Sequence, residues 1–155
     1  GNNIYMDGWT KMKIMKHGFK SFILNPKYFL EKNRNLKLHF DSFHGYGNLE
    51  KAINLLDAND QKDFRIFTEN QNYYNRGNMF ICKSKKIFNN YYDAVFTWLK
   101  KCEEVFGFDL DDKDYGKTRI YGFLVERFSS YWFNKYTKTK IWPIAFYNIN
   151  NINTL

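Results

Sequence analysis

The sequence predicts one α/β domain that is predominantly helical with a few short strands. Its 155 residues and 44% hydrophobic content suit a single domain with a core of its own. In several segments apolar residues recur at spacings of three and four, which is the period of an amphipathic helix. Two short apolar runs, within 75–84 and 141–149, have the character of strands.

The N-terminal part is basic and carries weak helical signals. Residues 9–24 place apolar side chains at spacings of three and four between lysines, but Gly18 interrupts the pattern. This segment is therefore either a weak helix or an irregular basic stretch. Pro26 can open a short helix over 26–33, because proline is tolerated in the first helical turn.

A helical hairpin is expected next. Asn48 is a suitable N-cap for a helix over 49–57, and Asn59 or Asp60 can cap a second helix. The turn residues of 75–84 then precede an apolar run, which predicts a buried strand.

The strongest helical pattern runs from Lys85 to Phe106. Ser84 can cap its start, and Gly107 can end it in the left-handed conformation. We expect one apolar face made of Phe88, Tyr91, Tyr92, Val95, Leu99, Cys102 and Phe106.

The C-terminal part contains an acidic loop, a helix and a strand. The loop over 108–117 leads to a helix over 118–135, whose buried side should carry Leu124 and Phe128. Residues 141–149 then alternate like a strand, and the proline within them places that strand near a sheet edge.

The positive charge of the chain is spread evenly. The formal net charge is +8, and residues 1–77 and 78–155 each contribute +4. The basic residues are 19 Lys and 5 Arg, whereas tight phosphate and base contacts favour the planar guanidinium. Much of the charge therefore indicates a solvated lysine surface.

Cysteine usage and hydropathy favour a cytoplasmic location. Cys82 and Cys102 do not form the close pairs of a zinc site, and two cysteines are too few for a disulfide framework. No apolar run approaches the roughly 20 residues of a membrane span, and no signal-peptide pattern is present. The chain starts with Gly1 rather than methionine, which suggests a part of a longer protein.

One stripe of the helix over 118–135 holds the most interesting polar residues. Arg119 and Glu126 are two turns apart, about 10.5 Å along the helix, and Gly122 lies between them. Glycine inside a helix costs about 1 kcal/mol relative to alanine, so it suggests a notch where a ligand approaches. An anionic or hydroxyl-rich ligand would suit the guanidinium and the carboxylate. The alternative is that both charges form structural ion pairs.

Metal sites and histidine ligands are weaker candidates. Asp109 and Asp111 form a D-x-D pair that could bind a metal together with a nucleotide sugar, but such a pair normally follows a buried strand, and here it follows a helix end, as a solvated acidic loop would. An EF-hand is excluded because Lys113 stands at a ligand position. We therefore expect no metal site from the sequence. His44 precedes a predicted helix N-terminus and could contact a ligand, or it could be a hydrogen-bonded structural histidine.

Four sequence blocks resemble a family of uncharacterised domains in bacterial capsular and exopolysaccharide glycosyltransferases with a GT-A-like fold. The resemblance extends from about His39 to Tyr147. Its most specific block is "RIYGFLVERFSSYWF", of the pattern R-x-x-G-F-h-x-E-R, where h is apolar. The other blocks are "HGYGNLEKAI", "NMFICKSKKIF" and "YYDAVFTWLKKCEE".

The resemblance implies roles for individual residues. Glu126 would be the catalytic base or would bind the acceptor hydroxyl, and Arg119 or Arg127 would hold phosphate or a structural partner. The substrate contacts would be completed by His44, Asn78 and Gly122. The segment 1–38 has no clear counterpart in the family pattern, so it is expected to be an insertion or a basic segment beside a family-like region over 39–147.

The implied reaction is transfer of a sugar from a nucleotide-sugar donor to a growing polysaccharide or a lipid-linked acceptor. The nucleotide-binding beginning of a GT-A domain is not recognisable, so the chain would be the C-terminal, acceptor-side part of the enzyme and could be inactive alone. No cofactor is evident, although the full-length enzyme could use a divalent metal. Transfer requires a base for the acceptor hydroxyl and positive charge for the departing diphosphate.

Two other functions stay open. One is a non-catalytic basic module that binds single-stranded nucleic acid, in which exposed rings such as Tyr73, Tyr74, Tyr121 and Trp132 would stack on bases. The other is a structural domain of a larger polysaccharide enzyme. We favour the transferase and expect no nucleic-acid partner.

The basic N-terminal stretch has two interpretations. Lys11, Lys13, Lys16 and Lys20 interleave with Trp9, Met12 and Phe19, a pattern that suits an anionic membrane surface. This would place the protein peripherally at the inner membrane. Alternatively, the apolar residues pack into the core.

Overall fold

A computed structural model describes residues 35–107 and 115–140, together with residues 11, 14, 15, 18–24, 26 and 30. Within these residues the chain forms helices and no strand, so the expected α/β class is wrong and the protein is a helical domain. The expectation of a GT-A-like architecture is wrong for the same reason. The strand expected over 141–149 and most of the helix expected over 26–33 lie outside the described residues.

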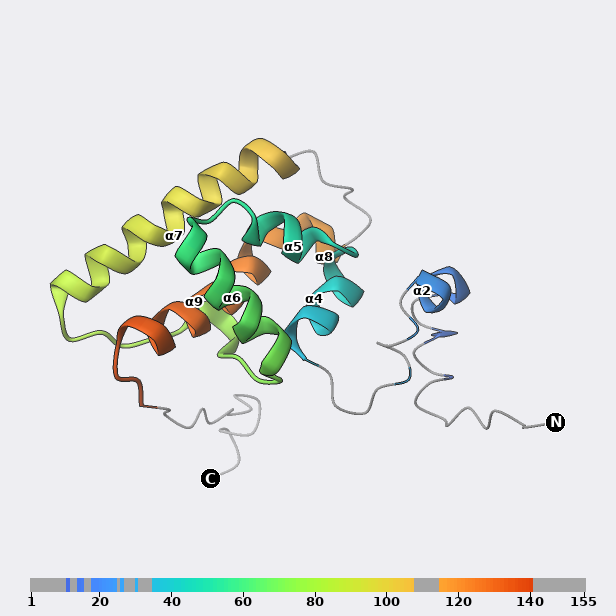
Figure 1. Ribbon diagram of the computed structural model, residues 1–155, viewed down its shortest axis with the longest axis horizontal. Helices are drawn as coiled ribbons and strands as arrows, with labels where there is room; N and C mark the ends of the chain where they lie inside the picture. The colour runs from blue at the N-terminus through green and yellow to red at the C-terminus, as the bar shows by residue number, and fades with distance from the viewer. Residues whose placement is uncertain are drawn as a thin grey trace, which may run out of the picture.

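The helices pack as a bundle with one short helix to its side (Figure 1). Long α7 crosses the bundle, and α9 packs against both α7 and α6. In chain order the elements are α2 (Phe19–Leu24), α4 (Leu36–His44), α5 (Asn48–Ile53), α6 (Ala58–Asn70), the 3-10 helix η1 (Arg76–Asn78), α7 (Lys85–Phe106), α8 (Tyr115–Thr118) and α9 (Ile120–Tyr136).

The two long helices confirm the sequence prediction. The side chain of Ser84 accepts a hydrogen bond from the Ile87 amide, and Gly107 ends α7 with a φ of 68°. These are local signals, which is why the sequence located both ends. The expected helix over 118–135 is interrupted at Arg119, which separates α8 from α9.

Helix α4 was not predicted. Its N-cap is Asn35, whose side chain accepts a hydrogen bond from the Leu38 amide, and its buried face carries Leu36 and Phe40. An Asn cap followed by apolar residues four apart could have revealed this helix. The consequence is that His44 ends one helix instead of standing free before another.

The predicted hairpin of α5 and α6 is confirmed, but its caps differ. Gly47, with a φ of 80°, precedes α5 in place of the expected Asn48. Asp57 caps α6 by accepting a hydrogen bond from the Asp60 amide. The side chain of Asn48 instead donates to the His44 carbonyl and so ties α5 to the end of α4.

The segment 75–84 is not the predicted strand. Gly77 and Asn78 have φ values of 81° and 53°, a left-handed pair that turns the chain. The apolar run that follows is extended but is paired with no other strand in the described residues. Phe80 anchors it, with ring centroids 4.7 Å from Phe133 and 5.2 Å from Tyr91. A short apolar run can thus be buried against helices without sheet pairing.

Aromatic side chains dominate the core between α6, α7 and α9. The rings of Trp98 and Phe128 stack at 4.7 Å, and those of Phe64 and Tyr131 stack at 4.8 Å. Trp98, which was not among the expected core residues, donates from its indole nitrogen to the Ala52 carbonyl at 2.7 Å. Phe88, which was expected in the core, is exposed. Most of the high aromatic content therefore serves packing.

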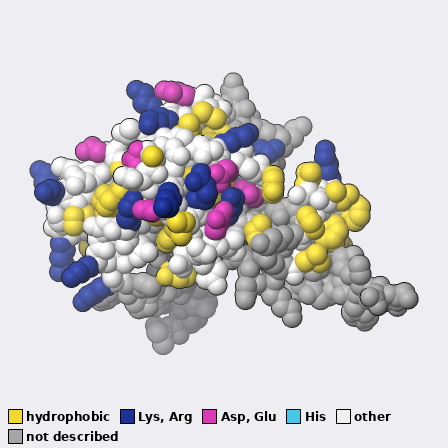
Figure 2. Space-filling model, viewed as in Figure 1, with side chains coloured by type: hydrophobic (Ala, Val, Ile, Leu, Met, Phe, Trp, Pro, Cys, Tyr) yellow, Lys and Arg dark blue, Asp and Glu magenta, His cyan; other side chains and the backbone are white. Residues whose placement is uncertain are grey.

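The charged surface is mixed. On the face seen in Figure 2, basic and acidic side chains are interspersed over the bundle. No helix in the described part of the chain has the length and apolar character needed to cross a membrane.

Candidate functional site

The stripe on α9 that carries Glu126 binds the turn at residues 75–78. The Gly77 amide donates to Glu126 Oε1 at 2.8 Å, and the Asn75 amide donates to Ser130 Oγ at 2.9 Å. The side chain of Asn78 reaches the Gly122 carbonyl at 3.4 Å. Two distant parts of the sequence that were both predicted to hold site residues are therefore in contact.

Glu126 is also paired with the residue that follows it. Its Oε2 accepts from Arg127 Nη1 at 3.1 Å, and the Arg127 side chain is completely buried. Arg127 further donates to the Phe123 carbonyl at 3.0 Å, and its Nη2 lies 3.1 Å from Nδ1 of His39. Burial lowers the pKa of Arg127, while Tyr74 and Glu126 oppose that shift. Its Nε has no hydrogen-bond partner among the described residues.

Aromatic rings surround this guanidinium. The Arg127 Cζ atom lies 4.1 Å from the ring centroid of Tyr74, 5.3 Å from that of Phe40 and 5.9 Å from that of Phe123. Cation–π contacts of this kind replace part of the hydration that a buried cation loses. Arg127 therefore joins α4, α9 and the segment before η1, and its side chain is enclosed between them.

His44 is buried on the same side of α9. Its ring stacks on Phe123 with centroids 4.1 Å apart, and its Nδ1 lies 3.1 Å from the Gly116 carbonyl oxygen. A carbonyl only accepts hydrogen bonds, so this contact places the proton on Nδ1. Since His44 is buried, this geometry favours the structural alternative for it.

Gly116 is a residue that sequence analysis missed. A Cβ atom there would lie 2.0 Å from the Phe43 carbonyl oxygen, a distance that backbone atoms cannot tolerate. The glycine lets α8 approach the end of α4 closely enough for the His44 contact. Its position within the acidic loop predicted over 108–117 gave no sign of this requirement.

Arg119 lies at the start of α9 and is exposed. It occupies the N-cap position, and its guanidinium donates to the Tyr115 hydroxyl. Its Cζ lies 5.3 Å from the Tyr115 ring centroid and 5.9 Å from that of Phe123. Phe123 therefore has both Arg119 and Arg127 within cation–π distance.

Gly122 faces open space. Apart from its chain neighbours and the nearby backbone of its own helix, no atom of the described residues lies within 4 Å of the position that its Cβ would occupy. Packing therefore does not require a glycine here, in contrast to Gly116. The exposed residues around this position are Arg119 and Asn78, and part of the Glu126 side chain also remains accessible.

The structure thus divides the six predicted site residues into two layers. Arg127 and His44 are buried beneath the rings of Phe123 and Tyr74, whereas Arg119, Gly122 and Asn78 form the surface. Glu126 connects the layers, because one oxygen binds the buried guanidinium and the other binds the turn.

An open pocket of about 360 Å³ lies on the other side of α4. Its lining includes Lys37, which is ion-paired at 3.0 Å with both Glu50 and Glu69. It also includes Asp41, a buried carboxyl whose Oδ1 has no partner among the described residues. Burial raises the pKa of Asp41 to about 6, although the backbone of Gly47 and nearby Lys37 oppose the shift.

The metal candidates cannot be located, because Asp109 and Asp111 lie outside the described residues. In the described part of the chain, no three His, Cys, Asp or Glu side chains gather as a metal site would require.

The rings proposed for base stacking are mostly engaged in packing. Trp132 is buried, Tyr74 covers Arg127, and the Tyr121 hydroxyl donates to the Gly107 carbonyl. Only Tyr73 of the four is largely exposed. This arrangement weakens the argument for a single-stranded nucleic-acid module, since such modules present several rings along one groove.

Comparison with known proteins gives a family without an activity. No curated protein and no solved structure matches the chain. One family matches over residues 7–138, and this match includes most of the N-terminal segment that precedes His39. The chain therefore belongs to the family described as a domain of unknown function, DUF4422.

Proposed function

We propose that the chain is a helical part of a glycosyltransferase that moves a sugar from a nucleotide-sugar donor to a capsular or exopolysaccharide acceptor. The sequence blocks that resemble such enzymes support this proposal. The match to an uncharacterised family leaves the activity open. The structural support for a transferase comes from the surface around Gly122.

The observation that carries the proposal is the open space at Gly122. A glycine within a helix costs about 1 kcal/mol, and no close neighbour in the described structure explains why a larger residue is absent. A ligand that approaches the backbone would explain it. The Gly122 carbonyl accepts a hydrogen bond from Asn78 Nδ2, so a polar group from another segment does reach the backbone at this position.

The groups beside Gly122 suit a phosphorylated sugar. Arg119 is one turn away and exposed, and a guanidinium binds phosphate oxygens in a planar, bidentate manner. Asn78 offers amide hydrogen bonds to sugar hydroxyls. Arg119 would hold phosphate, and Asn78 would orient the sugar.

Glu126 would bind or deprotonate the acceptor hydroxyl. Each carboxylate oxygen has two lone pairs, so the bonds from the Gly77 amide and from Arg127 leave each oxygen able to accept a further donor. Those two bonds also fix the direction of the carboxylate. A general base held in this way contributes about 10²–10⁴-fold to a transfer rate.

The proposal is tested by ligand-induced thermal shift on the full chain. The probes are UDP-glucose, UDP-galactose, GDP-mannose and a set of neutral oligosaccharides as acceptors. A ligand at 100 times its dissociation constant adds about 2.7 kcal/mol of stability. A rise in melting temperature with at least one probe is expected, and no rise with any of them would contradict the proposal.

Gly122→Ala shows whether binding takes place at this surface. The substitution improves helix propensity and meets open space, so the free protein should become more stable by up to about 1 kcal/mol. The ligand-induced shift should nevertheless fall, because the added methyl occupies the ligand's position.

Asn134→Ala is the matched control. Asn134 is exposed near the other end of α9, and alanine improves helix propensity there in the same way. This variant should keep the full ligand-induced shift. An equal shift in both variants would place the ligand elsewhere.

A further inference from the structure

The N-terminal part of the chain combines high positive charge with apolar residues. Between Trp9 and Arg34 the sequence contains seven basic side chains and one acidic side chain, Glu31. This segment therefore carries +6, residues 78–155 carry +4, and the remaining residues carry −2. A basic apolar segment of this kind is typical of membrane-surface binding.

The structure shows that most of the described apolar residues of this segment are exposed, while Ile14 and Phe22 are half-buried. Met15 is 86% exposed, and Phe19 and Ile23 are each 63% exposed. Leu24 and Leu30 are also exposed. The alternative in which the apolar residues pack into the core is therefore wrong for these side chains.

These residues form a surface apart from the helical bundle. Helix α2 stands to the side of the other helices (Figure 1), and hydrophobic side chains gather over it in Figure 2. Phe19 and Ile23 are four residues apart in α2 and therefore lie on one helical face. Exposed apolar side chains that gather in this way mark an interaction site.

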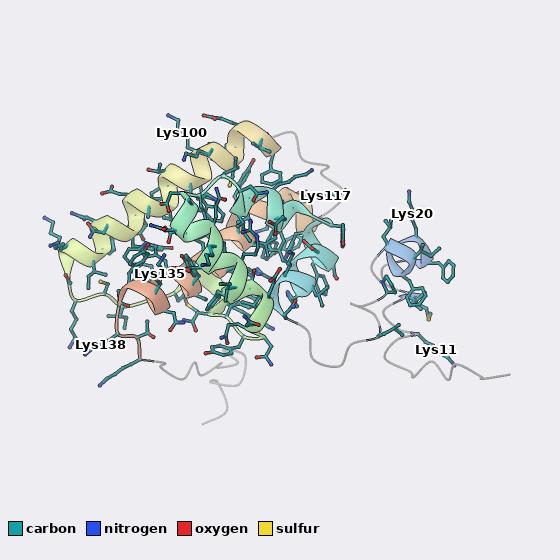
Figure 3. The ribbon with its side chains drawn as sticks, in the orientation of Figure 1. Lys11, Lys20, Lys100, Lys117, Lys135 and Lys138 are labelled. Atoms are coloured by element: carbon teal, nitrogen blue, oxygen red, sulfur yellow. The ribbon has the colours of Figure 1, made fainter. Side chains whose placement is uncertain are left out.

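Lysines accompany this apolar face. Lys11 and Lys20 are exposed, and Lys20 projects from α2 toward open space (Figure 3). Gly18, with a φ of 80°, ends the preceding helical turn through a 2.8 Å hydrogen bond from its amide to the Ile14 carbonyl. Lys20 and the apolar side chains of α2 therefore follow Gly18, whereas Lys11 and Met15 precede it.

We propose that Met15, Phe19, Ile23 and Leu24 insert at the surface of an anionic membrane while Lys11 and Lys20 contact lipid headgroups. The apolar side chains gain a hydrocarbon environment, and the lysines gain negatively charged neighbours. With only six residues, α2 lies in the interface rather than across the bilayer. This function is separate from sugar transfer and does not depend on it.

The test is co-sedimentation of the full chain with two kinds of vesicle at about 0.1 M salt. One kind is pure phosphatidylcholine, and the other contains phosphatidylglycerol as well. Binding should favour the anionic vesicles and weaken as salt is raised, because surface charges are screened over about 10 Å at this salt concentration.

Two double variants separate the charge from the apolar face. In Lys11→Gln/Lys20→Gln the anionic partition coefficient should fall by about fivefold for each lysine removed. In Phe19→Ala/Ile23→Ala binding should fall on anionic vesicles as well, and since both residues are exposed the fold is retained. Circular dichroism confirms that retention.

Matched controls use exposed residues of the bundle. Lys100→Gln/Lys138→Gln changes the net charge by the same amount, and Ile66→Ala/Val105→Ala removes a comparable exposed apolar surface. Both controls should bind as the wild type does.

Three results would overturn the proposal. The first is equal partition onto both kinds of vesicle. The second is unchanged binding in both N-terminal double variants. The third is a concentration-dependent dimer that Phe19→Ala/Ile23→Ala abolishes while no vesicle binding is seen, which would assign this face to a second copy of the chain.

Discussion

Helix α9 is held by α6 near its carboxyl end and by α4 nearer its amino end, and the two contacts differ in how completely their polar groups are paired. At the α6 contact, the Asp60 carboxylate accepts from Tyr131, Lys135 and Tyr136 at 2.6, 2.7 and 2.8 Å. Lys135 points toward this contact in Figure 3. All three donors come from α9, and all three bind the same oxygen, Oδ1.

The α4 contact is less completely paired. Arg127 Nε is buried at this contact without a partner among the described residues. Buried polar groups are nearly always hydrogen-bonded, so such exceptions call for an explanation. The α6 contact therefore pairs its carboxylate with three donors, whereas the α4 contact retains one buried guanidinium nitrogen that no described residue pairs.

Glu126→Gln should have the largest effect on stability. It removes the carboxylate paired with completely buried Arg127, and breaking a buried ion pair costs about 3–5 kcal/mol. Urea denaturation followed by circular dichroism measures the loss. Glu104→Gln, at an exposed position of α7, is the control and should change little. Unchanged stability with lost transfer activity would instead assign Glu126 to chemistry alone.

Asp60→Asn tests the contact between α6 and α9. Asparagine cannot keep three charge-assisted hydrogen bonds, so we expect a loss of about 3 kcal/mol. Burial alone would raise the pKa of Asp60, but its bonds to Lys135, Tyr131 and Tyr136 lower it overall. The wild-type contribution is therefore complete above pH 3.8 and declines as the pH falls further.

The difference between the variant and the wild type should narrow in that acidic range. A constant difference down to pH 2 would mean that the carboxylate charge does not stabilise the contact.

Asp41→Asn should act in the opposite direction. The folded-state pKa of Asp41 is about 6 and its usual value is 3.8, so the wild type loses stability as the pH rises between these values. Asparagine stays neutral, and the variant should be more stable by about 3 kcal/mol at pH 7. Below pH 4 the two proteins should have equal stability. Denaturation curves at several pH values decide this, and a difference independent of pH would contradict the prediction.

Asn78 should show the smallest effect. Its φ of 53° is a left-handed conformation that asparagine tolerates better than alanine and glycine tolerates best. Asn78→Ala should therefore be less stable than Asn78→Gly by about 1 kcal/mol. Equal stabilities would show that the turn at residues 75–78 changes conformation in the variants.

Local signals explain the parts of the fold that were predictable. The ends of α7 follow from Ser84 and Gly107, whose capping roles depend only on neighbouring residues. Helical spacing predicts that Gly122, Glu126 and Ser130 lie on one face of α9. In the structure Glu126 and Ser130 of this face bind the same segment of backbone. The partner itself, the backbone of the turn at residues 75–78, is more than 40 residues away in the sequence and was not predictable.

The sequence by itself determined the long helices, the basic N-terminal segment and the grouping of candidate polar residues on α9. Tertiary structure decided that the run after Asn78 has no strand partner among the described residues, that Arg127 is buried while Arg119 is exposed, and that Gly116 rather than Gly122 is required for packing. The physical reason is that capping and periodicity act within a few residues, whereas burial, ion pairing and close backbone approach depend on segments that meet only in the folded chain.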